Sequence, residues 1–409
     1  MPSFLAKLFP TSRDGAETAR GTDIDYRLLV PLVLNSAIIQ AVYAIERVTT
    51  SYRAVELNLP VIWLGVISAA FAILPIFVAV WVGRFMDRGN DAPACWIGAG
   101  LLVVACAGFR VSADSVTSLL LLTVLLGISH LFMMASQQML CIRCAGQRGR
   151  DAVFGNYLVA SAIGQGLGPY LIAWSSGTAR LPPTDRLFAI GLIISFASLA
   201  TAAAIRPAPK PAAHGHSKAI VPVRTLIRQP GLLAVLIASV ITITAQDLLT
   251  IYLPLLGTEK NINARDIGTL LTVRSVLSLV SRIGYVRVIH AVGRGPLTLA
   301  SMTGAGIGFA CLALPIPLSG MYAAMALMGL SLGIATTLSL TNVVDIASAE
   351  AMGTVMSLRI TGNRIGQVAL PFVASLVAAA AGVGGIFVII AVSLGVSGGA
   401  VHFGRRERA

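Results

Sequence analysis

The feature that most constrains this chain is a succession of twelve apolar stretches, each close to the roughly 20 residues that a helix needs to cross a bilayer. Only 11% of the residues are charged, whereas roughly 25% is usual in a soluble domain. We therefore expect an all-α, multi-pass membrane protein. The twelve expected spans are 27–52, 61–83, 94–111, 117–141, 152–175, 186–205, 231–256, 265–289, 296–314, 320–344, 352–378 and 385–403.

The basic residues indicate how the chain is oriented in the membrane. Although the net charge is +13, Lys and Arg occur singly between apolar runs and form no basic domain, so the partner is the lipid bilayer and we expect no nucleic acid. Most of them fall on one side of the predicted spans, for example Arg84, Arg88, Arg143 and Arg206. The positive-inside rule then predicts that both termini are cytoplasmic. We expect the membrane to be a bacterial inner membrane.

A proline-rich, basic stretch interrupts the apolar runs halfway along the chain and reads RPAPKPAAHGHSKAIVPVRTLIRQP. We expect it to be a cytoplasmic linker that separates six helices from six. The predicted organisation is a cytoplasmic segment at 1–26, a six-helix bundle at 27–205, the linker at 206–230, a second bundle at 231–403 and a cytoplasmic tail at 404–409.

The two halves resemble each other in sequence. Gly127 and Gly329 are 202 positions apart, as are the Ile-Gly-Gln triplets at 163–165 and 365–367. Asn58 and Asn261 are 203 positions apart. A near-constant offset indicates two six-helix pseudo-repeats, an architecture in which the substrate site lies between the halves.

Several chemistries have no support in the sequence. The five cysteines form no disulfide framework, and Cys141 and Cys144 make a C-x-x-C without a second ligand pair, so helix packing explains them better than a metal site. A nucleotide-binding loop and a nucleophile–base pair are not apparent either. We expect no cofactor, no metal and no enzymatic activity, and a protein that works as a monomer.

The loop after the second predicted helix carries Gly83, Asp87 and Arg88 in the order G-x-x-x-D-R. This motif resembles the signature of the major facilitator superfamily in its expected loop. The resemblance implies a twelve-helix secondary transporter in which Gly83, Asp87 and Arg88 contribute to a cytoplasmic gate. The corresponding loop in the second half has no aspartate, so the resemblance supports this gate in the first half alone.

The fifth predicted helix carries Gly155, Gly164, Gly168 and Pro169, spaced as in the antiporter signature of the same family. The final glycine pair of that signature is replaced at 172–173 by Ile and Ala. Glycines allow close helix approach and proline bends a helix, so we assign Gly164, Gly168 and Pro169 to gating. The pattern favours export, although ordinary packing of membrane helices explains it equally well.

Polar side chains share helix faces within the spans, and each is by default a functional candidate. Arginines are prominent among them, and their planar guanidinium groups match carboxylates or phosphates. An anionic small-molecule substrate follows, unless the arginines serve structural ion pairs or reach towards the surface. The expected substrate contacts are Gln40, Tyr43, Arg47, Gln246, Arg274, Asn363, Arg364 and Gln367.

Three further groups are candidates for coupling transport to protons. Asp247 and Glu46 are carboxylates in apolar surroundings, and His130 lies in the middle of the fourth predicted helix. Glu46 also suits a partner role for the adjacent Arg47, and His130 suits ordinary packing. The leading hypothesis is proton-coupled export of a small organic anion by alternating access. The alternatives are multidrug or cation–proton antiport, proton-driven carboxylate uptake, and a membrane sensor without transport.

Overall fold

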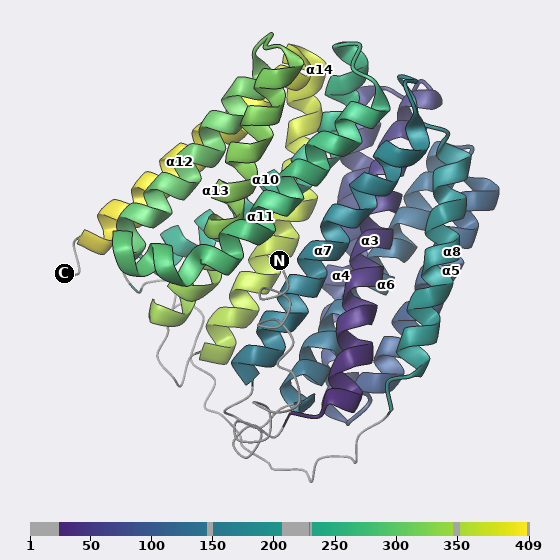
Figure 1. Cartoon of the computed structure of the whole chain (residues 1–409), viewed down its shortest axis with the longest axis vertical. Helices are drawn as coiled ribbons and strands as arrows, with labels where there is room; N and C mark the ends of the chain where they lie inside the picture. Colours follow the sequence, from purple (N-terminus) through teal and green to yellow (C-terminus); the bar gives the residue numbers. More distant parts are fainter. Residues whose placement is uncertain (1–23, 145–149, 207–228, 230, 347–351, 407–409) are drawn as a thin grey trace, which may run out of the picture.

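The computed structural model describes residues 24–144, 150–206, 229, 231–346 and 352–406 (Figure 1). Eleven helices are labelled in this part of the chain. Their bounds are α3 Tyr26–Glu56, α4 Val61–Asp87, α5 Asp91–Ser112, α6 Val116–Cys144, α7 Arg150–Ser176, α8 Thr184–Ala203, α10 Leu232–Glu259, α11 Ala264–Val292, α12 Arg294–Ala313, α13 Leu318–Ile346 and α14 Met352–Arg406.

The last helix, α14, is two helical segments joined at a bend. Gly382 lies at this bend with φ 72° and ψ 175°, a conformation that glycine adopts without the penalty of a Cβ atom. Counted this way, the described residues form twelve helical segments, in agreement with the twelve-helix prediction. Helices suit this chain because each backbone hydrogen bond is made within its own segment, where a bilayer offers no alternative partner.

Ten of the labelled helices in the described part are long and apolar enough to cross a membrane, with α14 counted once. Helix α7 is not among them. Small and polar residues are mixed with its aliphatic ones, and it contacts helices α3 and α11 extensively. The small residues allow α7 to pack closely against these two helices, while Ile163, Tyr170 and Trp174 keep an exposed apolar surface.

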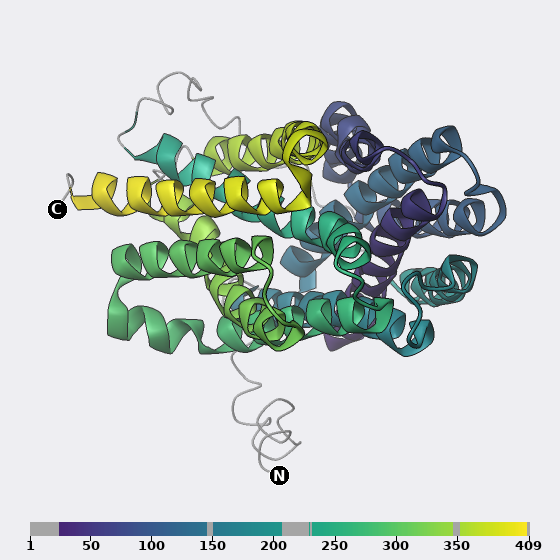
Figure 2. The ribbon, with the colours of Figure 1, turned by 90° about the horizontal axis from the view of Figure 1, so that it is seen from above.

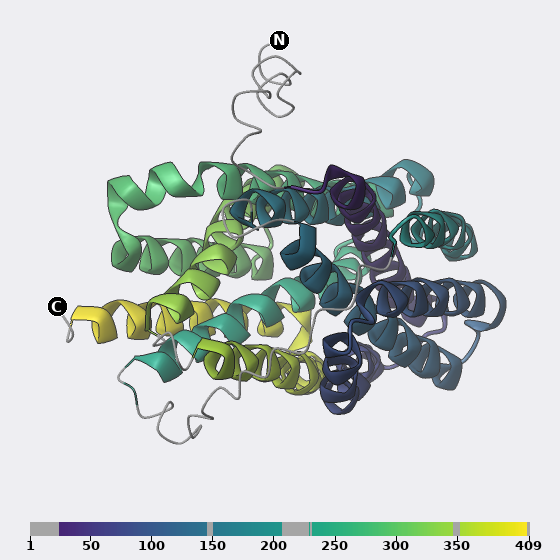
Figure 3. The ribbon, with the colours of Figure 1, turned by 90° about the horizontal axis from the view of Figure 1, so that it is seen from below.

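The chain forms two bundles that lie side by side, the first half in purple to teal and the second in green to yellow (Figure 1). The views from above and below show the same division (Figures 2 and 3). Within the first half, α3 packs against α6, α7 and α8, and within the second, α14 packs against α10 and α12. In the described part of the chain, the main contacts between the halves are those of α3 with α10, α4 with α14, and α7 with α11.

The internal repeat is visible in two matching turns. Asn58 follows α3 and Asn261 follows α10, and both adopt the left-handed conformation, with φ 52° and φ 58°. In each turn the next residue donates its N–H back into the last helical turn, Leu59 to Ala54 at 3.0 Å and Ile262 to Gly257 at 2.8 Å. This is the Schellman arrangement, which satisfies carbonyls at a helix end. We call this side of the molecule the Asn58 end.

The opposite side, where α4 turns into α5 and α11 into α12, is called the Arg88 end. Almost all of the expected linker at 206–230 lies outside the described residues, as do residues 1–23 of the N-terminal segment and 407–409 of the tail. Helix α14 continues to Arg406.

Candidate functional site

An ion pair joins the two halves of the chain near the middle of their first helices. Arg47 Nη1 of α3 lies 2.6 Å from Asp247 Oδ1 of α10. The two side chains are 16% and 17% exposed to solvent. Helix α3 therefore places the guanidinium of the first half directly against a carboxylate of the second. The guanidinium carbon also lies 4.8 Å from the ring centroid of Phe71 on α4, a cation–π distance.

A third helix completes this bridge. Gln367 Nε2 of α14 donates to the second oxygen of Asp247 at 2.7 Å, and Arg364 Nη1 donates to Gln367 Oε1 at 3.2 Å. Both carboxylate oxygens of Asp247 thus have partners from different helices. We call Arg47, Asp247, Gln367 and Arg364 the central network. It contains two guanidinium groups and one carboxylate, so its net charge is positive when Asp247 is ionised.

Arg274 adds to this positive charge from α11. Its side chain is 8% exposed, and one nitrogen, Nη2, lies 3.4 Å from the hydroxyl of Ser275. Its Nε has no hydrogen-bond partner among the described residues. Arg274 interacts electrostatically with Asp247, which makes Asp247 the shared counter-charge of three predicted substrate contacts.

The other predicted residues of α3 face into the first half. Gln40 Nε2 lies 3.3 Å from Met134 Sδ, and the Tyr43 hydroxyl lies 3.0 Å from that of Ser129. The ring of His130 packs edge-on against Tyr43, with centroids 4.6 Å apart. The Nδ1 atom of His130 has no hydrogen-bond partner in the described part of the chain.

Gln246 and Asn363 make their hydrogen bonds within the second half. Gln246 Nε2 donates to Thr336 Oγ1 of α13 at 2.9 Å, and Ser239 Oγ donates to Asn363 Oδ1 at 3.1 Å. The structure therefore divides the eight predicted substrate contacts. Three belong to the central network, one lies beside it, and four are bonded to groups of their own half.

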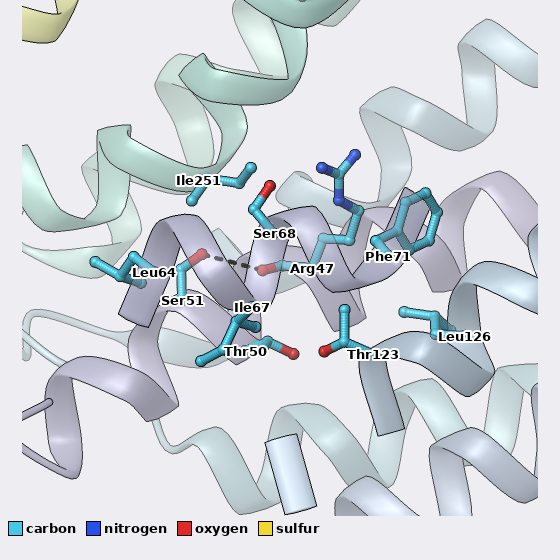
Figure 4. A pocket seen from close by; sticks show the side chains of 10 residues that line it. All are labelled: Arg47, Thr50, Ser51, Leu64, Ile67, Ser68, Phe71, Thr123, Leu126 and Ile251. Atoms are coloured by element: carbon cyan, nitrogen blue, oxygen red, sulfur yellow. Dashed lines mark hydrogen bonds between the residues drawn. The ribbon is translucent and has the colours of Figure 1, made fainter. Parts of the chain in front are cut away.

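A pocket lies beside Arg47 and is lined by α3, α4 and α6 of the first half and by Ile251 on α10 of the second (Figure 4). The guanidinium and the Ser68 hydroxyl point to one side of it, while the Thr50 and Thr123 hydroxyls point towards each other (Figure 4). The hydroxyls of Ser68 and Thr123 are buried without a partner among the described residues. The sequence did not single out these two residues as substrate contacts, because a lone hydroxyl in an apolar run gives no periodic signal.

Glu46 lies away from the central network. Its side chain is fully buried, and its carboxyl group faces the backbone of Gly191 on α8 and lies beside Cys106 on α5. Although adjacent in sequence to Arg47, it points into the interior of the first half. The structure thus separates the two carboxylates, and only Asp247 lies between the halves.

The glycines predicted for gating lie at close helix contacts. A Cβ atom on Gly168 would come within 2.6 Å of Ala44 Cβ, and one on Gly164 would overlap the Ala37 carbonyl oxygen. Both contacts are with α3, in the same half. Pro169 instead faces the other half, because its carbonyl oxygen would lie 2.7 Å from a Cβ atom on Gly268 of α11.

This contact between α7 and α11 has a counterpart in the internal repeat. On α4, a Cβ atom on Gly65 would overlap the carbonyl oxygen of Pro371 on α14 and lie 2.6 Å from Ser375. Gly65 and Gly268 occupy equivalent positions, as do Pro169 and Pro371. We call these the paired glycine contacts, and both lie towards the Asn58 end.

At the Arg88 end, the corresponding glycines make no close contact between the halves. Gly83 on α4 and Gly284 on α11 have open space at the position of a Cβ atom. Arg88 is exposed, and the side chain of Asp87 lies outside the described part. The halves are therefore in backbone contact at the Asn58 end, while glycines of the same two helices are free of such contact at the Arg88 end.

The sequence matches the family model described as Major Facilitator Superfamily twice, over residues 32–263 and 235–409. The chain belongs to the major facilitator superfamily. This membership confirms the resemblance of the loop motif, and the doubled match agrees with the internal repeat. No curated protein matches the sequence significantly.

Solved structures of other transporters share the fold. A mutant of the nucleoside transporter NupG superposes with a TM-score of 0.74 at 12% identity, covering 92% of this chain and 99% of that one. A bacterial homologue of the human lysosomal transporter Spinster gives 0.73 at 12% identity, with 92% and 96% covered. The human organic anion transporter MFSD10 gives 0.66 at 15% identity, with 92% and 99% covered.

The family and the fold together identify a multi-pass secondary transporter for small molecules, and not an enzyme. Two of these structures are named for different substrates, nucleosides and organic anions, and all three have low sequence identity to this chain, so they show the shared fold alone. The substrate of this chain has to be argued from its own residues.

Proposed function

We propose that this transporter exchanges a small organic anion for protons, by alternating access between the Asn58 end and the Arg88 end. The observation that carries the proposal is the position of Asp247. Its carboxylate is shared by Arg47 of the first half at 2.6 Å and Gln367 of the second half at 2.7 Å.

The chemistry of this arrangement couples a proton to an anion. Protonation of Asp247 removes its charge and weakens its ion pair with Arg47, which releases the bridge between the halves without a bound anion. Arg364 and Arg274 add positive charge on the second half. An anion bound between these arginines replaces Asp247 as their counter-charge and releases the same bridge. The halves therefore move with a proton in one direction and with an anion in the other, which is exchange.

Cation antiport has less support from the geometry. A cation site requires a carboxylate free to face the ligand, whereas Asp247 already contacts Arg47 and Glu46 points towards Gly191. Export, the direction we favour, rests on the glycine pattern of α7. We further propose that one chain forms the working unit, because both halves of the central network come from the same polypeptide, and that the Arg88 end and both termini face the cytoplasm of a bacterium.

The test uses protein reconstituted in vesicles with an imposed pH gradient and a panel of organic carboxylates and organic cations. The proposal expects proton-dependent flux of a carboxylate. Arg364→Leu should weaken substrate binding by about 30-fold or more, because it removes one partner of a desolvated charge contact. Arg110→Gln, which changes an exposed arginine at the end of α5, is the control and should leave binding unchanged.

Asp247→Asn separates the roles of proton and substrate. The amide cannot exchange a proton, so the gradient should no longer drive flux while carboxylate exchange across equal pH persists. Proton-driven flux of cations alone, or full proton drive in Asp247→Asn, would overturn the proposal.

A further inference from the structure

A second cavity lies in the other half of the molecule, away from the central network. Its volume is about 150 Å³, and it lies between α10 and the two segments of α14. Its deep wall includes the buried residues Ala245 and Leu248 of α10 and Ala374 and Ile390 of α14. Protein interiors rarely leave voids larger than a water molecule, so this space is not an ordinary packing defect.

The mouth of the cavity opens on the lipid-facing surface. Val373 and Ile389, on the two segments of α14, line the cavity and are each nearly half exposed. Their neighbours Phe372 and Leu376 are exposed to a similar degree. The opening is therefore continuous with an apolar surface that contacts the bilayer.

The depth of the cavity in the bilayer follows from its distance to the bend at Gly382, which we take as the point where both segments of α14 reach the membrane surface at the Asn58 end. Its residues on the first segment, 370–377, precede the bend at Gly382 by roughly 8 to 18 Å at 1.5 Å per residue. The hydrocarbon core extends about 15 Å on each side of the bilayer centre. Water is scarce at this depth, and the surrounding medium is made of acyl chains.

We propose that this cavity is a binding site for one acyl chain of a membrane lipid, inserted from the leaflet at the Asn58 end between the two segments of α14. The lining is aliphatic except for the hydroxyls of Thr244 and Ser393, which suits a hydrocarbon chain and offers nothing to a charged headgroup. The site lies beside the backbone that carries Asp247 and Gln367, because Leu248 follows Asp247 directly and Gly366, which faces Thr244, precedes Gln367.

The test is photolabelling of the protein in nanodiscs with a phospholipid that carries a diazirine on its acyl chain, followed by peptide mapping. Labels should concentrate on residues 370–377 and 386–393, relative to the exposed lipid face of α8 at Ile193 and Phe196. Because the readout is labelling, it is independent of which substrate the transporter carries.

Ala374→Phe fills the cavity and should reduce labelling there by at least about tenfold, because the acyl chain of the lipid can then bury at least two fewer methylene groups. Val377→Phe provides a second filling variant should the first not fold. Val396→Phe, at a position 67% exposed and outside the cavity, is the matched control and should leave the pattern unchanged.

Thr244→Val distinguishes a hydrocarbon occupant from a polar one. The Thr244 hydroxyl has no partner among the described residues, and an acyl chain needs none, so labelling should persist in this variant. Labelling that is uniform over all lipid-facing helices, that survives in both filling variants, or that is lost in Thr244→Val would overturn the assignment.

Discussion

The paired glycine contacts make a quantitative prediction about which end of the transporter is open. In Gly268→Ala, the new Cβ atom would lie 2.7 Å from the carbonyl oxygen of Pro169 and 2.8 Å from the nitrogen of Ala173. Both are backbone atoms, so no side-chain rotation relieves the overlap. The helices must separate by about 0.5–1 Å to restore ordinary contact near 3.5 Å.

Overpacking of this kind costs about 1–3 kcal/mol. The cost falls only on the state in which the halves meet at the Asn58 end, so the ratio of the two states should shift by about 5–150-fold towards opening there. Gly65→Ala, at the equivalent contact, should act in the same direction.

The control is Gly284→Ala on the same helix, where the Cβ position is free. Both variants gain the same helix propensity, about 1 kcal/mol for Ala over Gly, so this effect cancels in the comparison. Any difference between them therefore reports the contact between the halves.

The assay is a spin-label distance between Ser115 and Leu318, two exposed positions at the Asn58 end of opposite halves. Cys311 is replaced beforehand, because it is the cysteine that is not buried. Gly268→Ala should populate a longer distance and Gly284→Ala should not. Identical distance distributions in both variants and the parent protein would refute the reasoning.

Three further predictions concern single positions. Glu46→Gln should retain proton-driven flux in vesicles, because Glu46 lies apart from the central network; complete loss of proton drive would contradict this placement. Asn58→Ala should lower the free energy of unfolding by about 1–2 kcal/mol and Asn58→Gly should not, because its φ is 52°; equal denaturation midpoints in detergent would count against this. Gly164→Ala should lower thermal stability by about 1–3 kcal/mol, since the new methyl group overlaps the Ala37 carbonyl; an unchanged melting temperature would show that α7 and α3 adjust freely.

The fold was accessible from the sequence because its signals are local and repeated. Apolar runs of spanning length fix the helices, and the constant offset between Asn58 and Asn261 fixes the duplication. Both residues indeed lie in the same left-handed turn of their respective halves.

The site was accessible only in part. Helical periodicity places Arg47 on a polar stripe of the first helix, but it turns Asp247 about 100 degrees away from the corresponding stripe. Their ion pair, and the bond from Gln367, depend on how three helices from two halves approach one another. Periodicity describes the faces of a single helix and gives no distance between side chains on different helices. For the same reason, the periodicity did not predict that Ser68 and Thr123 line the pocket beside Arg47.

The two glycine contacts at the Asn58 end also behave as a bivalent ligand would. Once Gly65 meets Pro371, the rigid halves hold Gly268 close to Pro169, so the second contact forms at a high effective concentration. Each contact by itself is weak, but release requires both to separate together. The end is therefore either held at two points or free. The free-energy costs of substitutions at the two contacts then add in the equilibrium between these two states.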